Sequence, residues 1–290
     1  MSTVSEIKKT FREQGLTPKK WMGQNLLVGK QYLGKIVQAA QLEPGESIVE
    51  VGAGFGVLTE ALLEKGAKVV ALEVDSGFFR VLEDKFSGSP DVELIHADAL
   101  KFDFRALSQR IGKLRVVANL PYNISSRLLF MFQENRDAFS SLHILLQREV
   151  AERFVAKPGT KDYGVLTVLL GVTAEVKILF HIPGKAFFPA PEVMSSFLSV
   201  SFPDPPPVTV SDPRLLTTLV KASFTGRRKT LRNTLRNATM FGISNEGLIQ
   251  AAQETNIDLA RRGETLSPAE FARFADAIVF ERSKAHGYRS

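Results

Sequence analysis

The chain has 290 residues, of which 44% are hydrophobic and 23% charged, and its formal net charge is +6. This length suits one large core with a smaller appended unit, and the composition is that of an ordinary globular protein. The absence of cysteine excludes disulfides, thiol catalysis and thiolate metal sites.

Neither a membrane span nor a metal site is expected from the sequence. No apolar stretch approaches the roughly 20 residues that a membrane helix needs, and the first residues lack the apolar segment of a signal peptide. The four histidines show no ligand spacing; they are His96, His143, His181 and His286. We therefore expect a cytoplasmic protein without a bound metal.

The first strand of the predicted sheet, residues 47–51, runs directly into the glycine-rich turn Gly52-Ala53-Gly54-Phe55-Gly56, and a helical pattern follows. Glycines at such a turn let the backbone approach a ligand closely, and the turn opens a helix N-terminus toward it. Dinucleotide sites use G-x-G-x-x-G spacing to seat a pyrophosphate. The tighter G-x-G-x-G spacing suits a ligand without a phosphate, although the glycines of an ordinary α/β loop would fit the pattern about as well.

Acidic residues follow the next two predicted strands. The strand 68–72 ends in Glu73, where a carboxylate can accept both hydroxyls of a ribose. The strand 92–96 is followed by Asp98, which is placed to accept from an adenine amino group. Either carboxylate alone could be a helix cap or a surface charge. Together with the glycine turn, they predict a nucleoside-binding edge of the sheet.

The motif Asn119-Leu120-Pro121-Tyr122 follows the apolar run 114–118 and suits chemistry on an exocyclic amine of an aromatic base. The lone pair of such an amine is delocalised into the ring, so acceptors on its N–H bonds must draw the nitrogen toward tetrahedral geometry. The Asn119 amide oxygen and the Leu120 carbonyl are such acceptors. The Tyr122 ring can stack on the base, a contact worth roughly 1–3 kcal/mol. The motif therefore predicts attack by such an amine on an electrophile.

Predicted strands and helices alternate along the first 206 residues, which is typical of a doubly wound parallel α/β sheet. Strands are expected near Ile48, Val69, Leu94, Val116 and Ile144 and over 175–182 and 194–202, with helices near Leu58, Phe79, Leu107 and Leu128. The proline-rich run 203–207 cannot continue a helix or a central strand. It separates a sheet domain, 1–206, from an all-helical C-terminal domain, 207–290.

Helices are predicted beyond the prolines over 213–224, 227–239, 245–253 and 267–282. The last has Ser267 as its cap, Pro268 at the first position and Glu270 completing a capping box.

Basic charge is concentrated in this C-terminal part. From Pro207 onward the chain has 13 Lys and Arg against 8 Asp and Glu, which is +5 of the total +6. Five basic residues recur at short spacing, so a helix over 227–239 would hold much of this charge along one side; they are Arg227, Arg228, Lys229, Arg232 and Arg236. Such a stripe would bind RNA with salt-dependent affinity, although a solvated helix face without a partner remains the alternative.

The sequence resembles the ribosomal RNA adenine dimethyltransferases that use S-adenosylmethionine. The resemblance extends from about Lys19 to Ala277. It rests on the glycine turn, the motif at 119–125 and the blocks 23–25, 146–153, 161–164, 187–193 and 224–231. The resemblance implies a Rossmann-like methyltransferase sheet, S-adenosylmethionine as the cofactor and a monomer that acts on rRNA of the immature small ribosomal subunit.

The same resemblance implies a role for individual residues. The cofactor residues would be Gln24, Asn25, Leu27, Gly52, Gly54, Gly56, Glu73, Asp98 and Asn119. Phe187 would face Tyr122, so that the target adenine lies between two rings, although a phenylalanine is more often a core residue. The expected function is dimethylation of two adjacent adenines in a 16S rRNA hairpin, by in-line attack of the amine on the methyl carbon.

Two other interpretations stay open. A large-subunit adenine methyltransferase of the antibiotic-resistance kind shares the cofactor and amine motifs, although the blocks 227–233 and 262–267 resemble the small-subunit enzymes more. An RNA-binding assembly factor could keep the fold without catalysis, but every group needed for catalysis is present in the sequence.

Overall fold

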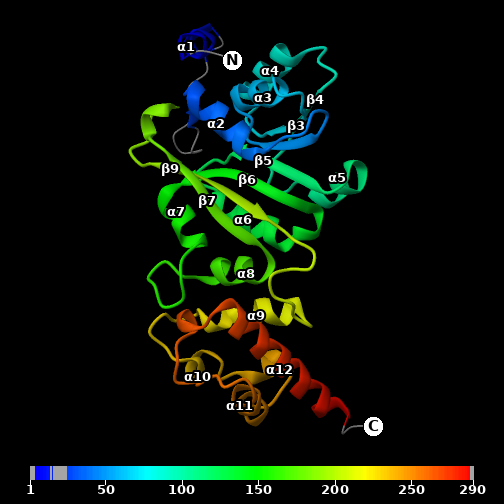
Figure 1. Ribbon diagram of the computed structural model, residues 1–290, viewed down its shortest axis with the longest axis vertical. Helices are drawn as coiled ribbons and strands as arrows, with labels where there is room; N and C mark the ends of the chain where they lie inside the picture. Colours follow the sequence, from blue (N-terminus) through cyan, green and yellow to red (C-terminus); the bar gives the residue numbers. More distant parts are fainter. Residues whose placement is uncertain (1–3, 14, 16–24, 288–290) are drawn as a thin grey trace. The chain divides into compact units, whose positions relative to one another are not determined.

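A computed structural model describes residues 4–13, 15 and 25–287 of the chain (Figure 1). Contacts within the chain divide it into two compact units. The first comprises residues up to Ala151 together with Lys177–Phe202, and the second comprises Glu152–Val176 and the chain from Pro203 onward.

The first unit is built on a sheet that has seven strands within the described residues, in the order β4-β3-β2-β5-β6-β9-β7. The strands are β2 (Ser47–Val51), β3 (Lys68–Glu73), β4 (Val92–His96), β5 (Leu114–Asn119), β6 (Phe139–Gln147), β7 (Glu175–Ile182) and β9 (Ser195–Ser201). The five strands from β4 to β6 run parallel, and β9 pairs antiparallel with β6. The predicted strands and their predominantly parallel arrangement are confirmed.

Helices flank this sheet (Figure 1). The helices between residues 4 and 154 are α1 (Val4–Glu13), α2 (Lys30–Ala40), α3 (Val57–Leu63), α4 (Ser76–Phe86), α5 (Phe104–Ile111), α6 (Ser125–Glu134) and α7 (Arg148–Phe154); α1 lies apart from the sheet in Figure 1. Short 3-10 turns are η2 (Arg136–Ala138) and η3 (Gly184–Ala186). Aspartates begin two of the crossover helices. The Asp75 carboxylate accepts from the N–H groups of Gly77 and Phe78, and Asp103 accepts from Ala106. These caps satisfy donors that the first helical turn leaves unpaired.

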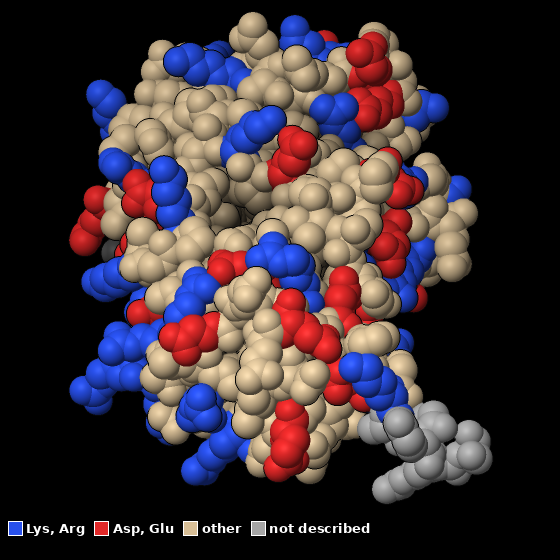
Figure 2. Space-filling model, turned by 60° about the horizontal axis from the view of Figure 1, so that its bottom comes forward, with Lys and Arg blue, Asp and Glu red and all other residues tan. Residues whose placement is uncertain are grey.

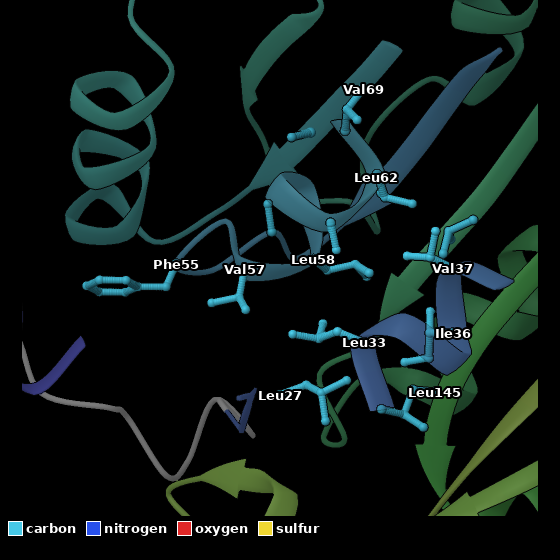
Figure 3. Packing of buried hydrophobic residues seen from close by; sticks show 14 of the residues in the cluster. Leu27, Leu33, Ile36, Val37, Phe55, Val57, Leu58, Leu62, Val69 and Leu145 are labelled. Carbon is cyan, nitrogen blue, oxygen red and sulfur yellow. The ribbon is translucent and has the colours of Figure 1, made fainter. Parts of the chain in front are cut away.

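Apolar side chains of α2, α3 and α4 pack on one face of the sheet in a continuous core. Figure 3 shows Leu33 of α2 beside Leu58 of α3 and Leu27 of the short strand β1 (Leu26–Leu27). β1 pairs antiparallel with β8 (Phe187–Phe188), which places Leu27 opposite Phe187 and Leu26 opposite Phe188. Because side chains alternate along a strand, Leu27 and Phe187 share one face of this ribbon and Leu26 and Phe188 share the other.

The strand order places the site-forming segments together. β2 has β3 on one side and β5 on the other, and both neighbours are parallel to it. The carboxyl ends of parallel strands meet at one edge of the sheet, and ligands bind there, where the strand order reverses. The segments that follow β2, β3, β4 and β5 therefore converge.

The second unit is helical among its described residues. Its helices are α8 (Val165–Thr173), α9 (Pro213–Ser223), α10 (Leu231–Thr234), α11 (Asn245–Glu254) and α12 (Pro268–Gly287), with 3-10 turns η4 (Ala238–Phe241) and η5 (Gly263–Thr265). The capping box of α12 is confirmed, because Ser267 N–H donates to Glu270 Oε2 at 2.7 Å and Glu270 N–H donates to Ser267 Oγ at 3.2 Å. No helix in the described part of the chain is both long and apolar enough to span a membrane.

The division between the units follows the proline run but differs from the predicted boundary in one segment. Residues Glu152–Val176 lie before the prolines, yet they belong to the second unit. The Tyr163 hydroxyl donates to the Leu266 carbonyl at 2.8 Å. A Cβ on Gly171 of α8 would lie 2.7 Å from Pro268, so α8 packs closely on the start of α12. Burial of the apolar α8 thus draws this segment to the C-terminal helices.

The helix predicted over 227–239 is wrong. Only the single turn α10 is helical there, and η4 follows after a break. The N–H groups of Leu231 and Arg232 donate to the carbonyls of Arg261 and Leu259, at 2.8 and 2.9 Å, instead of to carbonyls of a preceding helical turn. Tertiary backbone hydrogen bonds therefore replace the continuous helix, and the basic residues do not share one helix face.

Candidate active site

A cavity of about 290 Å³ lies at the carboxyl edge of the parallel strands, within the first unit. Eight of the predicted site residues line it: Asn25, Gly52, Gly54, Glu73, Asp98, Asn119, Leu120 and Pro121. Gln24 lies outside the described residues. Leu27, Gly56, Tyr122 and Phe187 are not part of the lining. The structure thus brings together the ends of β2, β3, β4 and β5, as the sequence predicts.

The glycine turn adopts a backbone that other residues rarely adopt. Gly52, Gly54 and Gly56 have φ angles of 74°, 56° and 68°. A Cβ on Gly54 would lie 2.9 Å from Leu26 Cδ2, on the lining of the cavity, whereas a Cβ on Gly56 would lie 2.7 Å from the Phe86 ring, inside the core. Gly54 therefore keeps the cavity open, and Gly56 permits the packing of α3 on α4.

Glu73 fixes the glycine turn from the neighbouring strand. One carboxylate oxygen accepts from the Gly54 N–H at 2.7 Å, and the other accepts from the N–H groups of Val74 and Asp75 at 2.9 and 2.8 Å. The side chain is 5% exposed, and its burial raises its pKa while the three donors oppose that shift. The oxygen bonded to Gly54 keeps a free lone pair for a ligand hydroxyl.

Asp98 lines the cavity beyond the end of β4 and is half-buried. Its Oδ1 accepts from the Leu100 N–H at 3.0 Å, which fixes the direction of the carboxylate. This geometry leaves acceptor capacity on the carboxylate toward the cavity.

Asn119 ends β5 with its two amide atoms in different roles. Nδ2 donates to the Asn25 carbonyl at 2.7 Å, which joins β5 to the segment before β1. Oδ1 is buried and accepts no hydrogen bond from the described residues. A buried acceptor without a donor costs free energy, so such an atom marks a place where a ligand donor belongs. An amine in the cavity would supply that donor.

The two predicted rings lie differently. Tyr122 is half-buried, and its hydroxyl lies 2.5 Å from Ser195 Oγ. Phe187 is 3% exposed and packs in the core with Leu27. In this structure Phe187 does not reach the cavity, because the β1–β8 ribbon directs it to the core face. Phe188, its half-buried neighbour, shares the opposite face with Leu26, which lines the cavity.

Arg127 and Asn123 line the cavity and were not predicted. Both follow the 119–122 motif, and Ile124 and Arg127, three residues apart at the start of α6, share one side of its first turn. This helical spacing in the sequence could have predicted that Arg127 lies on the same side of α6 as Ile124. Among the residues that the structure describes, no group of three His, Asp or Glu side chains could hold a metal ion.

Comparison with known proteins shows the family to which the chain belongs. A model of the family described as Ribosomal RNA adenine dimethylase matches residues 15–277. The chain belongs to the ribosomal RNA adenine dimethylase family. It is 41% identical over 289 residues to Ribosomal RNA small subunit methyltransferase A of Shouchella clausii, with 98% of each chain covered. It is 42% identical over 271 residues to the protein of that name from Geobacter metallireducens, with 93% of this chain and 98% of the relative covered.

Two solved structures share the fold of this dimethylase chain. A dimethyladenosine transferase from Plasmodium falciparum has a TM-score of 0.71 at 23% identity, covering 90% of this chain and 98% of that one. The 23S rRNA methyltransferase ErmE has a TM-score of 0.65 at 22% identity, covering 88% of this chain and 100% of that one. These likenesses confirm the Rossmann-like methyltransferase fold. Family membership confirms the resemblance seen in the sequence and makes the chain an rRNA adenine dimethyltransferase.

Alanine at Gly54 and alanine at Gly56 should differ in their effect on ligand affinity, although both substitutions strain a backbone with positive φ. Gly54→Ala is expected to reduce the affinity for S-adenosylhomocysteine at least tenfold, because its Cβ meets Leu26 on the cavity wall. Gly56→Ala should chiefly lower the free energy of unfolding, by about 1–3 kcal/mol, through overpacking against Phe86. Calorimetric titration and urea unfolding of both variants check this. Equal loss of affinity in both would contradict the separate roles.

Glu50 is expected to make the stability of the dimethylase depend on pH. This β2 side chain is 2% exposed, and Thr59 Oγ1 donates to its Oε2 at 2.5 Å. Burial, reinforced by the nearby Glu73, raises the pKa to about 8, while the Thr59 hydrogen bond and Lys85 oppose that rise. The folded state thus holds a proton that the unfolded state loses near pH 4.5.

The contribution of Glu50 to the free energy of unfolding should therefore fall as the pH rises from about 4.5 to about 8, by up to about 1.4 kcal/mol per pH unit. The lowered pKa of His143, about 4, contributes with the opposite sign below about pH 6.5, so the difference between wild type and Glu50→Gln isolates the Glu50 contribution. Urea unfolding between pH 5 and 8 measures this slope. Glu50→Gln, which cannot ionise, should flatten it; an unchanged slope in this variant would show that another group is responsible.

Proposed function

We propose that this enzyme uses S-adenosylmethionine to dimethylate the exocyclic amines of two adjacent adenines in a 16S rRNA hairpin, during biogenesis of the small ribosomal subunit. The observation that carries the proposal is the buried Oδ1 of Asn119, which accepts no hydrogen bond from the described residues and belongs to a residue that lines the cavity with the glycine turn and two carboxylates. Relatives named Ribosomal RNA small subunit methyltransferase A support the choice of substrate.

The residues present fit S-adenosylmethionine. Gly52 and Gly54 let the backbone approach a ligand that has no phosphate, and a Cβ at Gly54 would fill that space. Glu73 retains an acceptor lone pair for the ribose, and Asp98 retains acceptors for the adenine amino group. When bound, the cofactor supplies an electrophilic methyl group on a sulfonium.

The protein's part in the reaction is alignment. Asn119 Oδ1 and the Leu120 carbonyl would accept from the two N–H bonds of the target amine and hold its lone pair in line with the methyl group. Holding two reactants in this way can contribute about 7–11 kcal/mol to lowering the barrier. No strong general base is required, because the nitrogen becomes acidic once it carries the methyl group, and its proton can then leave to these acceptors or to water.

The Tyr122 ring would support the target base by stacking, a contact worth roughly 1–3 kcal/mol. Phe187 and Phe188 are the candidates for the ring on the opposite side of the base. Phe187 could stack only if it left the core, where it is 3% exposed. Comparing turnover of Phe187→Ala and Phe188→Ala, with unfolding free energies measured in parallel, identifies which ring faces the base.

The C-terminal basic residues are proposed to bind RNA phosphates. Arg227, Arg228, Lys229, Arg232 and Arg236 are all exposed. Lys229 and Arg236 line a polar hollow of about 380 Å³ together with Thr225, Asn233 and Thr234. Arg227 is bound in part to Glu264, at 3.6 Å. Basic side chains also gather along the lower left of the face drawn in Figure 2. A polyanion would gain affinity here by counterion release.

Reversing the charge of Arg228 should weaken RNA binding in a salt-dependent manner. Arg228→Glu is expected to lower affinity for a small-subunit rRNA fragment at low salt and to reduce the slope of log affinity against log salt by about 1. Fluorescence anisotropy at several salt concentrations measures both quantities. Arg273→Glu, an exposed change in α12, is the matched control. Equal effects of the two reversals would mean that only net charge matters.

Methyl mapping tests the proposed function as a whole. The protein is incubated with labelled S-adenosylmethionine and with unmethylated small or large subunits, and the modified nucleotides are identified by mass spectrometry. We expect two adjacent dimethyladenines in 16S rRNA. Transfer to 23S rRNA would instead support the large-subunit alternative. Absence of transfer, with retained binding to small subunits, would support a non-catalytic assembly factor.

The enzyme is proposed to act as a monomer in the cytoplasm.

A further inference from the structure

Tyr122, the proposed stacking residue, is held at both ends. Its carbonyl accepts from Ser125 Oγ at 3.1 Å, and the Ile124 N–H donates to the Pro121 carbonyl at 3.2 Å, so the main chain around it is fixed. At the other end, the phenol oxygen lies 2.5 Å from Ser195 Oγ. A ring anchored at its main chain and at its phenol oxygen retains little freedom to swing away from this position.

The serine at the far end is itself fixed. Ser195 is 0% exposed and begins β9, where it is in register with Gln147 of β6. It directly follows the aromatic and proline loop 187–194. The hydrogen bond therefore joins the 119–122 motif to a sheet strand 73 residues away in sequence. Burial raises the pKa of the Tyr122 phenol, which keeps it neutral and able to donate.

We propose that Ser195 is a positioning residue, whose hydroxyl fixes the position of the Tyr122 ring against which the target adenine stacks. This inference rests on the proposed function, in which Tyr122 supports the base. Asn119, three residues earlier, would hold the target amine. The position of the Tyr122 ring relative to the Asn119 side-chain amide therefore determines the direction of the lone pair on the amine nitrogen. A ring that is fixed beforehand avoids the entropy loss of ordering it in the reacting complex.

Removing the hydroxyl should slow transfer without affecting the cofactor site, because Ser195 does not line the cavity. We expect Ser195→Ala and Tyr122→Phe each to lower kcat about two- to tenfold at saturating cofactor. The affinity for S-adenosylhomocysteine should be unchanged. Since both variants break the same hydrogen bond, the double variant should be no slower than the slower single one. Ser195→Thr, which restores a hydroxyl, should recover most of the rate.

Ser196 provides a matched control. It is also 0% exposed, and its Oγ lies 2.8 Å from His181 Nδ1. Its side chain points to the opposite face of β9 from that of Ser195. Ser196→Ala should therefore leave kcat unchanged. If it slowed transfer as much as Ser195→Ala, the effect would be one of strand stability, and the proposal would fail.

Three further results would overturn the inference. They are additive losses in the double variant, a Ser195→Ala enzyme as fast as the wild type, and a loss of cofactor affinity that parallels the loss of rate. If the wild-type enzyme itself transferred no methyl group, the proposed function would fail first. An active wild type with an unaffected Ser195→Ala variant would overturn the role of Ser195 alone.

Discussion

Asn119→Ala is expected to lower the rate of methyl transfer about 100- to 1,000-fold, the range found when one preorganised polar group is removed from a reacting centre. The variant loses the buried Oδ1 acceptor and also the 2.7 Å hydrogen bond from Nδ2 to the Asn25 carbonyl. Affinity for the cofactor should fall much less, because the glycine turn, Glu73 and Asp98 remain. Single-turnover kinetics at saturating cofactor measure the rate, and calorimetry measures the affinity.

Asn119→Asp separates the two functions of the amide. Aspartate keeps oxygen acceptors toward the cavity but cannot donate to the Asn25 carbonyl. If acceptance from the amine matters most, Asn119→Asp should retain more activity than Asn119→Ala, despite weaker anchoring of the segment before β1. An Asn119→Ala enzyme within tenfold of the wild-type rate would show that Asn119 does not align the amine.

Glu73→Ala should have the largest effect on stability among the cavity residues. It leaves the buried N–H groups of Gly54 and Asp75, and the part-buried N–H of Val74, without their acceptor. Each buried unpaired donor costs about 1–3 kcal/mol, so the two buried donors alone should lower the unfolding free energy by at least about 2 kcal/mol. The same change releases the glycine turn, and affinity for S-adenosylhomocysteine should fall below detection. Urea unfolding without ligand and calorimetric titration give the two quantities.

Asp98→Ala is the matched comparison for this second prediction. Asp98 is half-buried, and its carboxylate accepts from the Leu100 N–H at 3.0 Å. Its removal should weaken the cofactor affinity while costing about 1 kcal/mol of stability. If the free energy of unfolding of Glu73→Ala were no lower than that of Asp98→Ala, the three hydrogen bonds that Glu73 accepts would not be stabilising the glycine turn.

The cavity could be predicted from sequence because its residues follow strands. Gly52, Glu73, Asp98 and Asn119 each occur where an apolar strand ends, and parallel strands bring those ends to one edge. That inference needed only the order of strands and the alternation with helices. The capping box of α12 could also be predicted from the sequence, because its two residues lie within one helical turn of each other.

Other features depended on contacts between distant segments. The apolar run Val165–Thr173 has no periodicity that distinguishes a helix from a buried strand. The basic segment 227–239 fits a helical spacing, yet backbone hydrogen bonds to Leu259 and Arg261 override it. The burial of Phe187 follows from a two-residue pairing with β1 that no local pattern reveals. In each case, contacts with a segment distant in sequence select one of several structures that the local sequence allows.

The most direct test of the whole account is a crystal structure with S-adenosylhomocysteine. We expect the ligand in the cavity at the ends of β2, β3, β4 and β5, with its ribose hydroxyls on Glu73, its adenine amino group on Asp98 and its sulfur directed toward Asn119. Ligand density outside this cavity, or an Asn119 side chain turned away from the sulfur, would contradict the assignment of the catalytic site.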